Sequence, residues 1–484
     1  MNDDNGKLTM KPGSGGLVTA MAPVLRNRGG LWIGWPGITS EREDETNGII
    51  HDENQNPGYD LKPVHLNEQE VQNFYYGFAN EIVWPLFHDL QSQCNFAPEY
   101  WNTYQRVNEK FADVILEHQQ PEDFIWIHDY HLMSVARMLR QKGTQSKLGY
   151  FLHIPFPPID IFMKIPWRFQ ILRDLLQYDL LGFQTPRDRR NFTQCVRALI
   201  KEARFKPKKQ VQKCIYEHRE IYIGYFPISI DYNEFADTAA SEAVSNGAWY
   251  IHEDLPHQQI ILGVDRLDYT KGIPNRFRAF RNFLRNYPEL HEQITLIQVV
   301  VPSRTHIPMY AQLKEEIERL VGEINGEFTK SGWVPIHYIF RSLSRDELLA
   351  YYRTAEIALI TPLKDGMNLV AKEYCASTVE EDGVLILSEF AGSAYEFNKH
   401  ALLVNPYDLE GTAEAIHKAY NMPFEERQKR MKKMRGIVHK HDIFKWVDAF
   451  LRAAVGKDLL HFPIIDENLP VVEEIGEAQV ADQL

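Results

Sequence analysis

Residues 357–375, IALITPLKDGMNLVAKEYC, decide the fold. The first four are apolar and have the length and composition of a buried strand. A polar turn follows at residues 361–366, and apolar side chains then recur with the spacing of one helix face, as Leu369, Val370, Tyr374 and Cys375. A strand, a turn and a helix in this order make half of a βαβ unit. Because open α/β sheets bind ligands at the carboxyl ends of their strands, this turn is a predicted binding site.

The start of the predicted helix carries two features that suit an anionic ligand. The backbone amides of residues 366–369 would be free there and would face the ligand. Asp365 and Glu373 are eight positions apart, about two turns at ~3.6 residues each, so one can reach a ligand at the helix end and the other along its side. For this pair alone, a helix cap at Asp365 and a solvated charge at Glu373 is the better interpretation. The rest of the chain favours the binding site.

Size and composition narrow the class of protein. A chain of 484 residues is too long for one simple core, and its 44% hydrophobic and 25% charged residues are typical of globular proteins. The net charge of −13 argues against a nucleic-acid partner. The four cysteines show no CxxC spacing, which argues against disulfides and zinc and fits the cytoplasm. No apolar run approaches the ~18 residues of a membrane span, and the polar start lacks the apolar core of a signal peptide. The oligomeric state is open, a homo-oligomer included.

Polar residues follow three predicted strands of the first half. These strands are predicted at residues 124–128, 150–154 and 180–183. Their carboxyl ends bring Asp129, His153 and Gln184 together, like the rim of one cleft. A proline-rich turn after His153 would hold its backbone stiffly, which favours a functional histidine, whereas His131 is better explained as structural. The His and Asp spacings match no metal-ligand pattern, so no metal site is predicted.

The first 90 residues hold further candidates. Gly15 and Gly16 precede a helix predicted at 18–25, where a double glycine allows close approach to a ligand or is simply a flexible turn. The segment LWIGWPG, residues 31–37, is a predicted strand whose two tryptophans, one of them Trp35, point to opposite faces. Residues 38–60 are interpreted as a loop, residues 60–66 as a strand and residues 67–87 as mainly helical, with Tyr75 a core aromatic by default.

The second half begins again with a strand, at residues 259–264, and a charged loop follows it. Arg266 and Lys271 lie on this loop, just ahead of the next helix. Two cations at a strand end, beside a helix start, can hold a diphosphate. The alternative is a surface loop in which Asp265 and Asp268 pair with these cations.

Strands alternate with helix-length segments twice along the chain. The remaining strands are predicted at residues 219–231, 294–301, 335–340, 357–360, 383–387 and 401–404, and Ser393 is a predicted helix cap. This order predicts an α/β protein with two doubly wound parallel sheets. The expected division is a first domain at 1–232, a second at 233–445, a helical region at 446–462 that packs back on the first half, and a disordered tail at 463–484.

The chain resembles the retaining glycosyltransferases that make trehalose 6-phosphate, from about residue 15 to about residue 460. The motifs that carry this resemblance are SGGLVTA, LWIGWPG, WIHDYHL, FLHIPFPP, LLGFQT, VDRLDYTKG, TPLKDGMNLVAKEY and VLILSEFAGSA. It implies a GT-B fold, in which two Rossmann-like domains enclose the active site. It also implies transfer of glucose from a nucleotide diphosphate, usually UDP-glucose, to the anomeric hydroxyl of glucose 6-phosphate, with retention.

The resemblance further implies a role for each matching residue. On the donor side it assigns the phosphates to Gly15, Gly16, Arg266 and Lys271, the glucose to Asp365 and His153, the uracil to Leu343, the ribose to Glu373, and the sugar and phosphates to the amides of Gly366, Met367, Asn368 and Leu369. On the acceptor side it assigns glucose 6-phosphate to Trp35, Tyr75, Asp129 and Arg304. The catalytic set is then Arg266, Lys271, Asp365, His153 and Asp129, with Gln184 near the donor or supporting the cleft. The two cations replace a metal at the leaving group, so no cofactor is expected, and no enzyme nucleophile is implied.

One departure from the family pattern stands at the start of the chain. The family opens with an apolar strand ending in Ser-Asn-Arg, whose arginine helps to bind the acceptor phosphate. Here the sequence begins with the polar segment MNDDNGKLTMKPGSGG instead. We therefore expect an unpaired edge in the first sheet and weaker binding of the acceptor phosphate.

Two alternatives remain at this point. The same chemistry could use another phosphorylated acceptor, such as glycerol 3-phosphate, although the retained acceptor residues favour a sugar phosphate. The chain could also be a non-catalytic regulatory homologue, against which the intact Arg266, Lys271, Asp365 and Glu373 argue. The preferred nucleotide base of the donor is not determined by the sequence.

Overall fold

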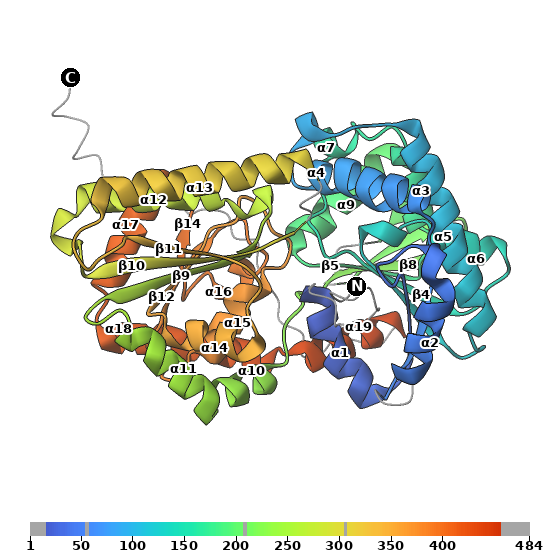
Figure 1. The fold of residues 1–484 in the computed structure, drawn as a ribbon. Helices are drawn as coiled ribbons and strands as arrows, with labels where there is room; N and C mark the ends of the chain where they lie inside the picture. Colours follow the sequence, from blue (N-terminus) through green and yellow to red (C-terminus); the bar gives the residue numbers. More distant parts are fainter. Residues whose placement is uncertain (1–15, 54–57, 207–210, 304–306, 456–484) are drawn as a thin grey trace, which may run out of the picture.

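The computed structural model describes residues 16–53, 58–206, 211–303 and 307–455. Gly15, Arg304 and the tail predicted at 463–484 lie outside these residues. The described chain forms two α/β lobes that lie side by side (Figure 1). This arrangement confirms the predicted pair of Rossmann-like sheets.

The first lobe is built on a sheet whose strand order is β3-β4-β5-β8-β7-β6. Its strands are β3 (Phe124–His128), β4 (Lys147–Phe151), β5 (Leu180–Phe183), β8 (Arg219–Tyr225), β7 (Gln212–Tyr216) and β6 (Arg204–Phe205). The first four are parallel, and β7 and β6 extend the sheet in antiparallel fashion. Strands β1 (Leu31–Gly34) and β2 (Asp60–Pro63) pair separately, so among the described strands β3 lies at the edge of the larger sheet.

The helices of the first lobe cover this sheet. They are α1 (Gly16–Arg28), α2 (Glu43–Glu53), α3 (Glu68–Glu70), α4 (Trp84–Phe87), α5 (Pro98–His118), α6 (Val135–Gln141), α7 (Ile159–Phe162), α8 (Arg168–Leu175) and α9 (Pro186–Leu199), with a π-helical segment Val71–Val83 between α3 and α4. Helix α2 corrects the loop predicted at 38–60. Its sequence, EDETNGIIHDE, is mostly polar, so it shows none of the apolar periodicity that marks a helix against a core.

The second lobe has a parallel sheet with the strand order β11-β10-β9-β12-β13-β14. Its strands are β9 (Gln259–Arg266), β10 (Ile294–Val301), β11 (Ile336–Phe340), β12 (Ile357–Ile360), β13 (Val384–Ser388) and β14 (Leu402–Val404). Numbered along the chain, this is the Rossmann order 3-2-1-4-5-6. The order reverses between β9 and β12, and such a switch point opens a crevice at the carboxyl ends of the two strands.

Helices cover both faces of this second sheet, as its apolar strands require. They are α10 (Tyr232–Ala239), α11 (Glu242–Glu253), α12 (Ile273–Asn286), α13 (Pro308–Phe328), α14 (Arg345–Thr354), α15 (Leu369–Ser377), α16 (Ala394–Phe397), α17 (Leu409–Tyr420) and α18 (Phe424–Lys440).

The last described helix, α19 (Ile443–Ala454), returns to the first lobe (Figure 1). Its Trp446 donates a hydrogen bond from Nε1 to the Phe226 carbonyl at 2.9 Å. The ring of Phe450 stacks on Trp126 with centroids 4.3 Å apart. A Cβ at Gly149 or Gly182 would lie 2.9 or 2.7 Å from this ring, so two glycines of β4 and β5 make the hollow that holds it. Helix α19 is therefore part of the first lobe's core.

Candidate active site

The switch point of the second sheet is occupied by a buried ion pair. Lys271 lies in a 3-10 turn (Tyr269–Lys271) after β9, and its Nζ is 2.6 Å from Oδ2 of Asp365, in the turn after β12. The two side chains are 15% and 10% exposed. Burial raises the pKa of Asp365, but the charge and hydrogen bond of Lys271 and the Met367 amide outweigh it and hold this pKa below its usual value. Asp365 is therefore a fixed carboxylate.

The same carboxylate takes two of the amides that were expected to be free. Oδ1 of Asp365 accepts from the backbone nitrogens of Met367 at 3.1 Å and Asn368 at 3.2 Å. The helix cap is Asn368, in the left-handed region at φ 57°, whose side chain accepts from the Ala371 amide at 3.1 Å. The turn thus presents an anion held by two of its own amides, which corrects the expectation that the amides of residues 366–369 are all free. The alternative of a helix cap at Asp365 described this kind of contact, although the cap residue of α15 itself is Asn368.

Arg266 is the last residue of β9, so the strand is longer than predicted and the arginine lies on its end instead of in the loop. The aspartates that could have paired with the cations are used elsewhere. Asp265 pairs with the fully buried Arg276, and the side chain of Asp268 accepts from the Thr270 amide at 2.9 Å. Of the partners proposed in the surface salt-bridge alternative, Asp265 is thus taken by Arg276, and Lys271 pairs with Asp365 instead.

Glu373 lies farther along α15, on the second lobe's side of the crevice. It accepts a hydrogen bond from the Tyr352 hydroxyl at 2.9 Å, and burial raises its pKa. Leu343, just before α14, is half-buried against the apolar core that also contains Tyr352. The two predicted nucleoside contacts thus lie on neighbouring parts of the second lobe, Glu373 in α15 and Leu343 just before α14, and these two helices pack on each other.

The first lobe contributes a connected polar group at the ends of β3, β4 and β5. Strand β4 ends at Phe151, earlier than predicted, so His153 lies beyond it. Its ring nitrogens are 3.1 Å from His128 Nδ1 and 3.2 Å from Gln184 Nε2, and its amide donates to Asp129 at 3.3 Å. Burial lowers the pKa of His153 well below its usual value and that of His128 to about 3. The predicted trio of Asp129, His153 and Gln184 is therefore brought together, with His128 as an unpredicted member.

Asp129 has a strained backbone, with φ 70° and ψ 172°. This region is occupied almost only by glycine and costs other residues about 1–3 kcal/mol. Such strain is typical of functional sites, where the surrounding structure imposes it.

The two lobes meet at Gly366. A Cβ at this position would lie 2.5 Å from the carbonyl oxygen of His153, so only a glycine lets the donor-side turn reach the backbone of the first lobe. Behind it, a Cβ at Gly392 would lie 1.9 Å from the Gly366 carbonyl oxygen. Two residues before Gly366, the Nζ of Lys364 lies 2.6 Å from Oδ2 of Asp89 in the first lobe.

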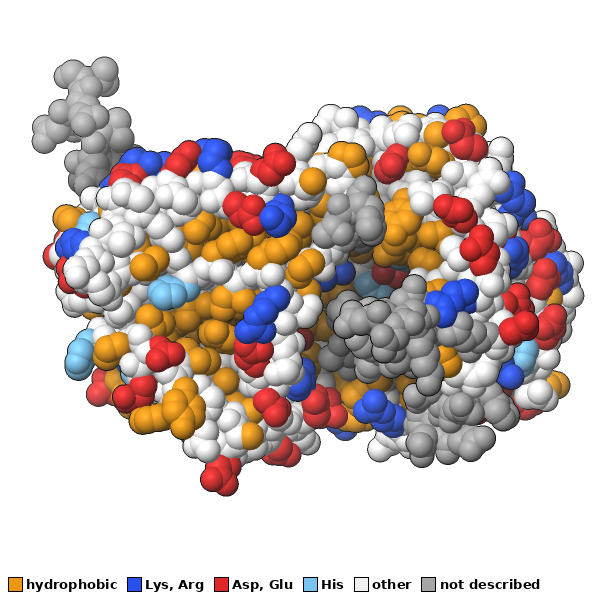
Figure 2. Space-filling model, viewed as in Figure 1, with side chains coloured by type: hydrophobic (Ala, Val, Ile, Leu, Met, Phe, Trp, Pro, Cys, Tyr) orange, Lys and Arg blue, Asp and Glu red, His pale blue; other side chains and the backbone are white. Residues whose placement is uncertain are grey.

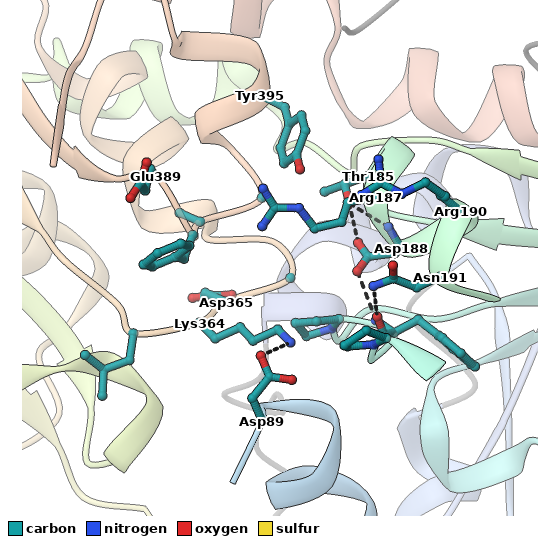
Figure 3. Close-up of a pocket in the computed structure, with 18 of the residues that line it drawn as sticks. Asp89, Thr185, Arg187, Asp188, Arg190, Asn191, Lys364, Asp365, Glu389 and Tyr395 are labelled. Carbon is teal, nitrogen blue, oxygen red and sulfur yellow. Dashed lines mark hydrogen bonds and ion pairs between the residues drawn. The ribbon is translucent and has the colours of Figure 1, made fainter. Parts of the chain in front are cut away.

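The contact borders a cavity of about 380 Å³ between the lobes. Figure 3 shows Arg187 and Thr185, at the start of α9, facing Tyr395 and Glu389 of the second lobe across it, with the Lys364–Asp89 pair below. Figure 2 shows that the molecular surface is hollowed between the lobes. Of the predicted site residues, Asp365 and Gly366 line this cavity.

Three of the four predicted acceptor residues, Trp35, Tyr75 and Asp129, lie in the part of the chain that the structure describes. The rings of Trp35 and Tyr75 lie 5.3 Å apart, and Trp35 donates from Nε1 to the Ile38 carbonyl at 2.8 Å. Trp35 follows β1 instead of lying in it, so the alternation of strand faces does not decide its direction. His131 stacks on Tyr75 at 5.8 Å, in keeping with a structural histidine. Arg304 lies outside the described residues, and Gly16 opens α1.

His88, just after α4, was not predicted as a site residue, because no motif or spacing in the sequence marks it. Its Nδ1 donates to the Trp84 carbonyl at 2.7 Å. Burial lowers its pKa to about 4, against the hydrogen bond to Trp84 and the charges of Asp268 and Asp365, which raise it. A neutral histidine of the first lobe therefore lies within electrostatic reach of the Lys271–Asp365 pair.

Two kinds of feature are absent from the described residues. Within these residues, no cluster of three or more His, Cys, Asp or Glu could hold a metal ion. In the same part of the chain, no helix is long and apolar enough to cross a membrane.

Comparison with known proteins now identifies the family. The model of glycosyltransferase family 20 matches residues 1–455. The chain belongs to glycosyltransferase family 20. Its family 20 relatives include the trehalose-6-phosphate synthases of Mycolicibacterium gilvum, 40% identical over 97% of this chain and 93% of that protein, and of Mycolicibacterium smegmatis, 41% identical over 93% and 88%.

Solved structures agree with this membership. An alpha,alpha-trehalose-phosphate synthase (UDP-forming) from Burkholderia xenovorans, in complex with glucose-6-phosphate, superimposes with a TM-score of 0.85 at 33% identity, covering 92% of this chain and 97% of that one. The E. coli protein bound with UDP-2-fluoro glucose gives 0.84 at 36% identity, covering 92% and 97%. The family 20 chain therefore has the GT-B fold.

Proposed function

We propose that this protein transfers glucose from UDP-glucose to glucose 6-phosphate, with retention, and releases trehalose 6-phosphate and UDP. The observation that carries this proposal is the Lys271–Asp365 pair at the switch point, next to Gly366, which lies against the backbone of His153 and so joins the pair to the Asp129–His153 group of the first lobe. Family 20 membership, with relatives named for this activity, supports the same reaction.

On the donor side, the residues of the second lobe divide the nucleotide sugar among them. Arg266 and Lys271 hold the diphosphate, Glu373 binds the ribose diol and Leu343 lies against the uracil. Asp365 binds hydroxyls of the glucose, and its pairing with Lys271 fixes the distance between the sugar and the phosphate. Gly15 and Gly16 approach the phosphates from the first lobe.

Departure of UDP leaves positive charge on the sugar ring and negative charge on the diphosphate. Fixed cations at that oxygen stabilise the transition state where the charge develops. The other member of the Lys271–Asp365 pair, the Asp365 carboxylate, lies next to the sugar, where positive charge develops. The acceptor hydroxyl oxygen attacks C1 of the glucose on the face that UDP leaves, the bond from C1 to the phosphate oxygen breaks, and the hydroxyl proton passes to that departing phosphate oxygen. The reaction uses no enzyme nucleophile, and the cations do the work of a metal.

On the acceptor side, glucose 6-phosphate lies in the first lobe. Trp35, Tyr75 and Asp129 hold its sugar, and Arg304 holds its phosphate. His153 separates this half of the site from the donor turn, because its amide bonds to Asp129 and its carbonyl lies against Gly366. We place the reaction in the cytoplasm, where both substrates are available.

The deciding experiment measures UDP release from UDP-glucose with glucose 6-phosphate, with glycerol 3-phosphate and with no acceptor. We expect release only with glucose 6-phosphate, and the same rate after treatment with EDTA. Turnover with glycerol 3-phosphate alone would overturn the acceptor, and binding of UDP without turnover on any acceptor would make the chain a non-catalytic homologue. Loss of activity with EDTA would overturn the metal-free clamp.

A further inference from the structure

The ring of His153 is held at both nitrogens inside the protein. The residue is 2% exposed. Its Nδ1 lies 3.2 Å from Nε2 of Gln184, and its Nε2 lies 3.1 Å from Nδ1 of His128. The rings of the two histidines are also stacked, with centroids 5.4 Å apart.

A backbone amide sets the direction of these hydrogen bonds. The side-chain oxygen of Gln184 accepts from the amide of Ile228 at 2.9 Å. If the side-chain nitrogen of Gln184 stood where its oxygen stands, two N–H donors would point at each other. The Gln184 NH₂ group must therefore face His153. Since Gln184 donates, Nδ1 of His153 must accept and carries no proton.

The remaining proton positions follow in sequence. A neutral imidazole with a bare Nδ1 carries its proton on Nε2, so His153 donates to Nδ1 of His128. His128 in turn carries its proton on its own Nε2. A doubly protonated His153 would point an N–H at the Gln184 N–H, so the geometry also excludes the charged form. Burial, which lowers the pKa of both histidines, acts in the same direction.

The backbone of His153 joins the two halves of the site. Its amide donates to Oδ1 of Asp129, and its carbonyl lies 2.5 Å from the position that a Cβ of residue 366 would take. A ring locked in one orientation therefore fixes the spacing between the acceptor carboxylate and the donor turn.

We propose that Gln184 and His128 are positioning residues that hold His153 as the neutral Nε2–H tautomer, so that His153 sets the distance between the half-sites and exchanges no proton during transfer. This inference rests on the proposed glucosyl transfer for its consequence. The tautomer itself is a property of the protein without substrate.

The test is the ¹⁵N spectrum of the full chain labelled at histidine, recorded without substrate, with the His153 signal identified by its loss in His153→Asn. We expect an unprotonated Nδ1 and a protonated Nε2, unchanged from pH 6 to pH 8. In Gln184→Glu a carboxylate faces Nδ1 and must accept, so the proton should move to Nδ1 of His153. The exposed Gln93→Glu is the matched control and should leave the spectrum unchanged.

A protonated Nδ1 in the wild-type protein, or a Gln184→Glu spectrum like that of the wild type, would overturn the proposal. Kinetics give the second measurement. The oxygen of His153→Asn can still accept from Gln184, so we expect kcat to fall less than about tenfold, whereas loss of a general acid or base costs about 10²–10⁴-fold. A loss in that larger range, with the fold intact by circular dichroism, would make His153 a proton-transfer residue. Absence of turnover in the wild-type protein would instead overturn the proposed function and leave the tautomer untouched.

Discussion

Replacement of Lys271 by methionine tests the centre of the proposed site. Methionine keeps an unbranched side chain one atom shorter than that of lysine and removes its charge, which leaves Asp365 largely buried without its cation. Removing one partner of a buried pair costs about 3–5 kcal/mol. Asp365 keeps its hydrogen bonds from the amides of Met367 and Asn368, so we expect the lower end, about 3 kcal/mol.

The effect on turnover has a separate origin and a separate magnitude. Loss of one preorganised charge at a developing oxyanion costs about 10²–10³ in kcat. The stability loss should also fade in acid. Because the folded pKa of Asp365 lies below its unfolded value, its contribution is present above the unfolded pKa and is lost as pH falls through the folded one. Wild type and Lys271→Met should therefore approach each other in stability below about pH 4.

Lys314→Met is the matched control. Lys314 pairs with Glu318 at the same distance, 2.6 Å, but on the exposed face of α13. Such a pair contributes about 0.3–0.5 kcal/mol, and it lies away from the proposed site. Urea unfolding followed by tryptophan fluorescence and a UDP-release assay measure the two effects. Equal stability of the two variants, or turnover of Lys271→Met within fivefold of wild type, would refute the reasoning.

Three further changes address other parts of the site. Gly366→Ala places a Cβ against the His153 carbonyl and should lower kcat/KM at least tenfold. Gly326→Ala is the control, because this helix position has open space around it, and it should leave kcat/KM unchanged. Equal kcat/KM values for the two variants would show that the contact between the lobes has no part in the mechanism. Asp129→Gly relieves a strained backbone, so we expect stability within about 1 kcal/mol of wild type together with a loss of at least about 10² in kcat/KM for glucose 6-phosphate. A kcat/KM for this acceptor within fivefold of wild type would contradict the assignment. His88 has a folded pKa of about 4, so the unfolded chain takes up its proton first and wild-type stability should fall between pH 6.5 and 4, by up to about 1.4 kcal/mol per pH unit from this group. Urea unfolding at several pH values should show a smaller fall for His88→Gln, and parallel curves would contradict it.

The strands of both sheets were predictable where an apolar run ends at a polar turn. The runs at 124–128, 180–183, 294–301 and 357–360 match β3, β5, β10 and β12 residue for residue. Where the prediction extended too far, as at 150–154 and 219–231, the chain leaves the sheet but remains buried. Leu152, Ile154, Phe226 and Ile228 are nearly inaccessible to solvent, so hydrophobicity continues after the strand hydrogen bonds stop.

The sequence predicts which site residues lie at the carboxyl ends of strands. It does not predict which of these residues contact one another. Lys271 and Asp365 were each placed at the carboxyl end of a strand, but their pairing spans 94 positions and depends on the order of β9 and β12 in the sheet. The amides of the turn were expected to face a ligand, and a cap at Asp365 was the alternative, because the sequence alone does not decide whether this carboxylate turns onto the amides or toward a ligand. His128 was not predicted as a site residue, because its partner, His153, follows a different strand, β4.

The return of α19 to the first lobe has a consequence for how the protein is made. Strands β4 and β5 leave the ribosome more than 250 residues before Phe450, the side chain that fills their glycine hollow. The amino-terminal lobe must therefore wait, with an aromatic-lined surface uncovered, until the whole second lobe has been synthesised. The first lobe is therefore completed only after translation has passed Phe450.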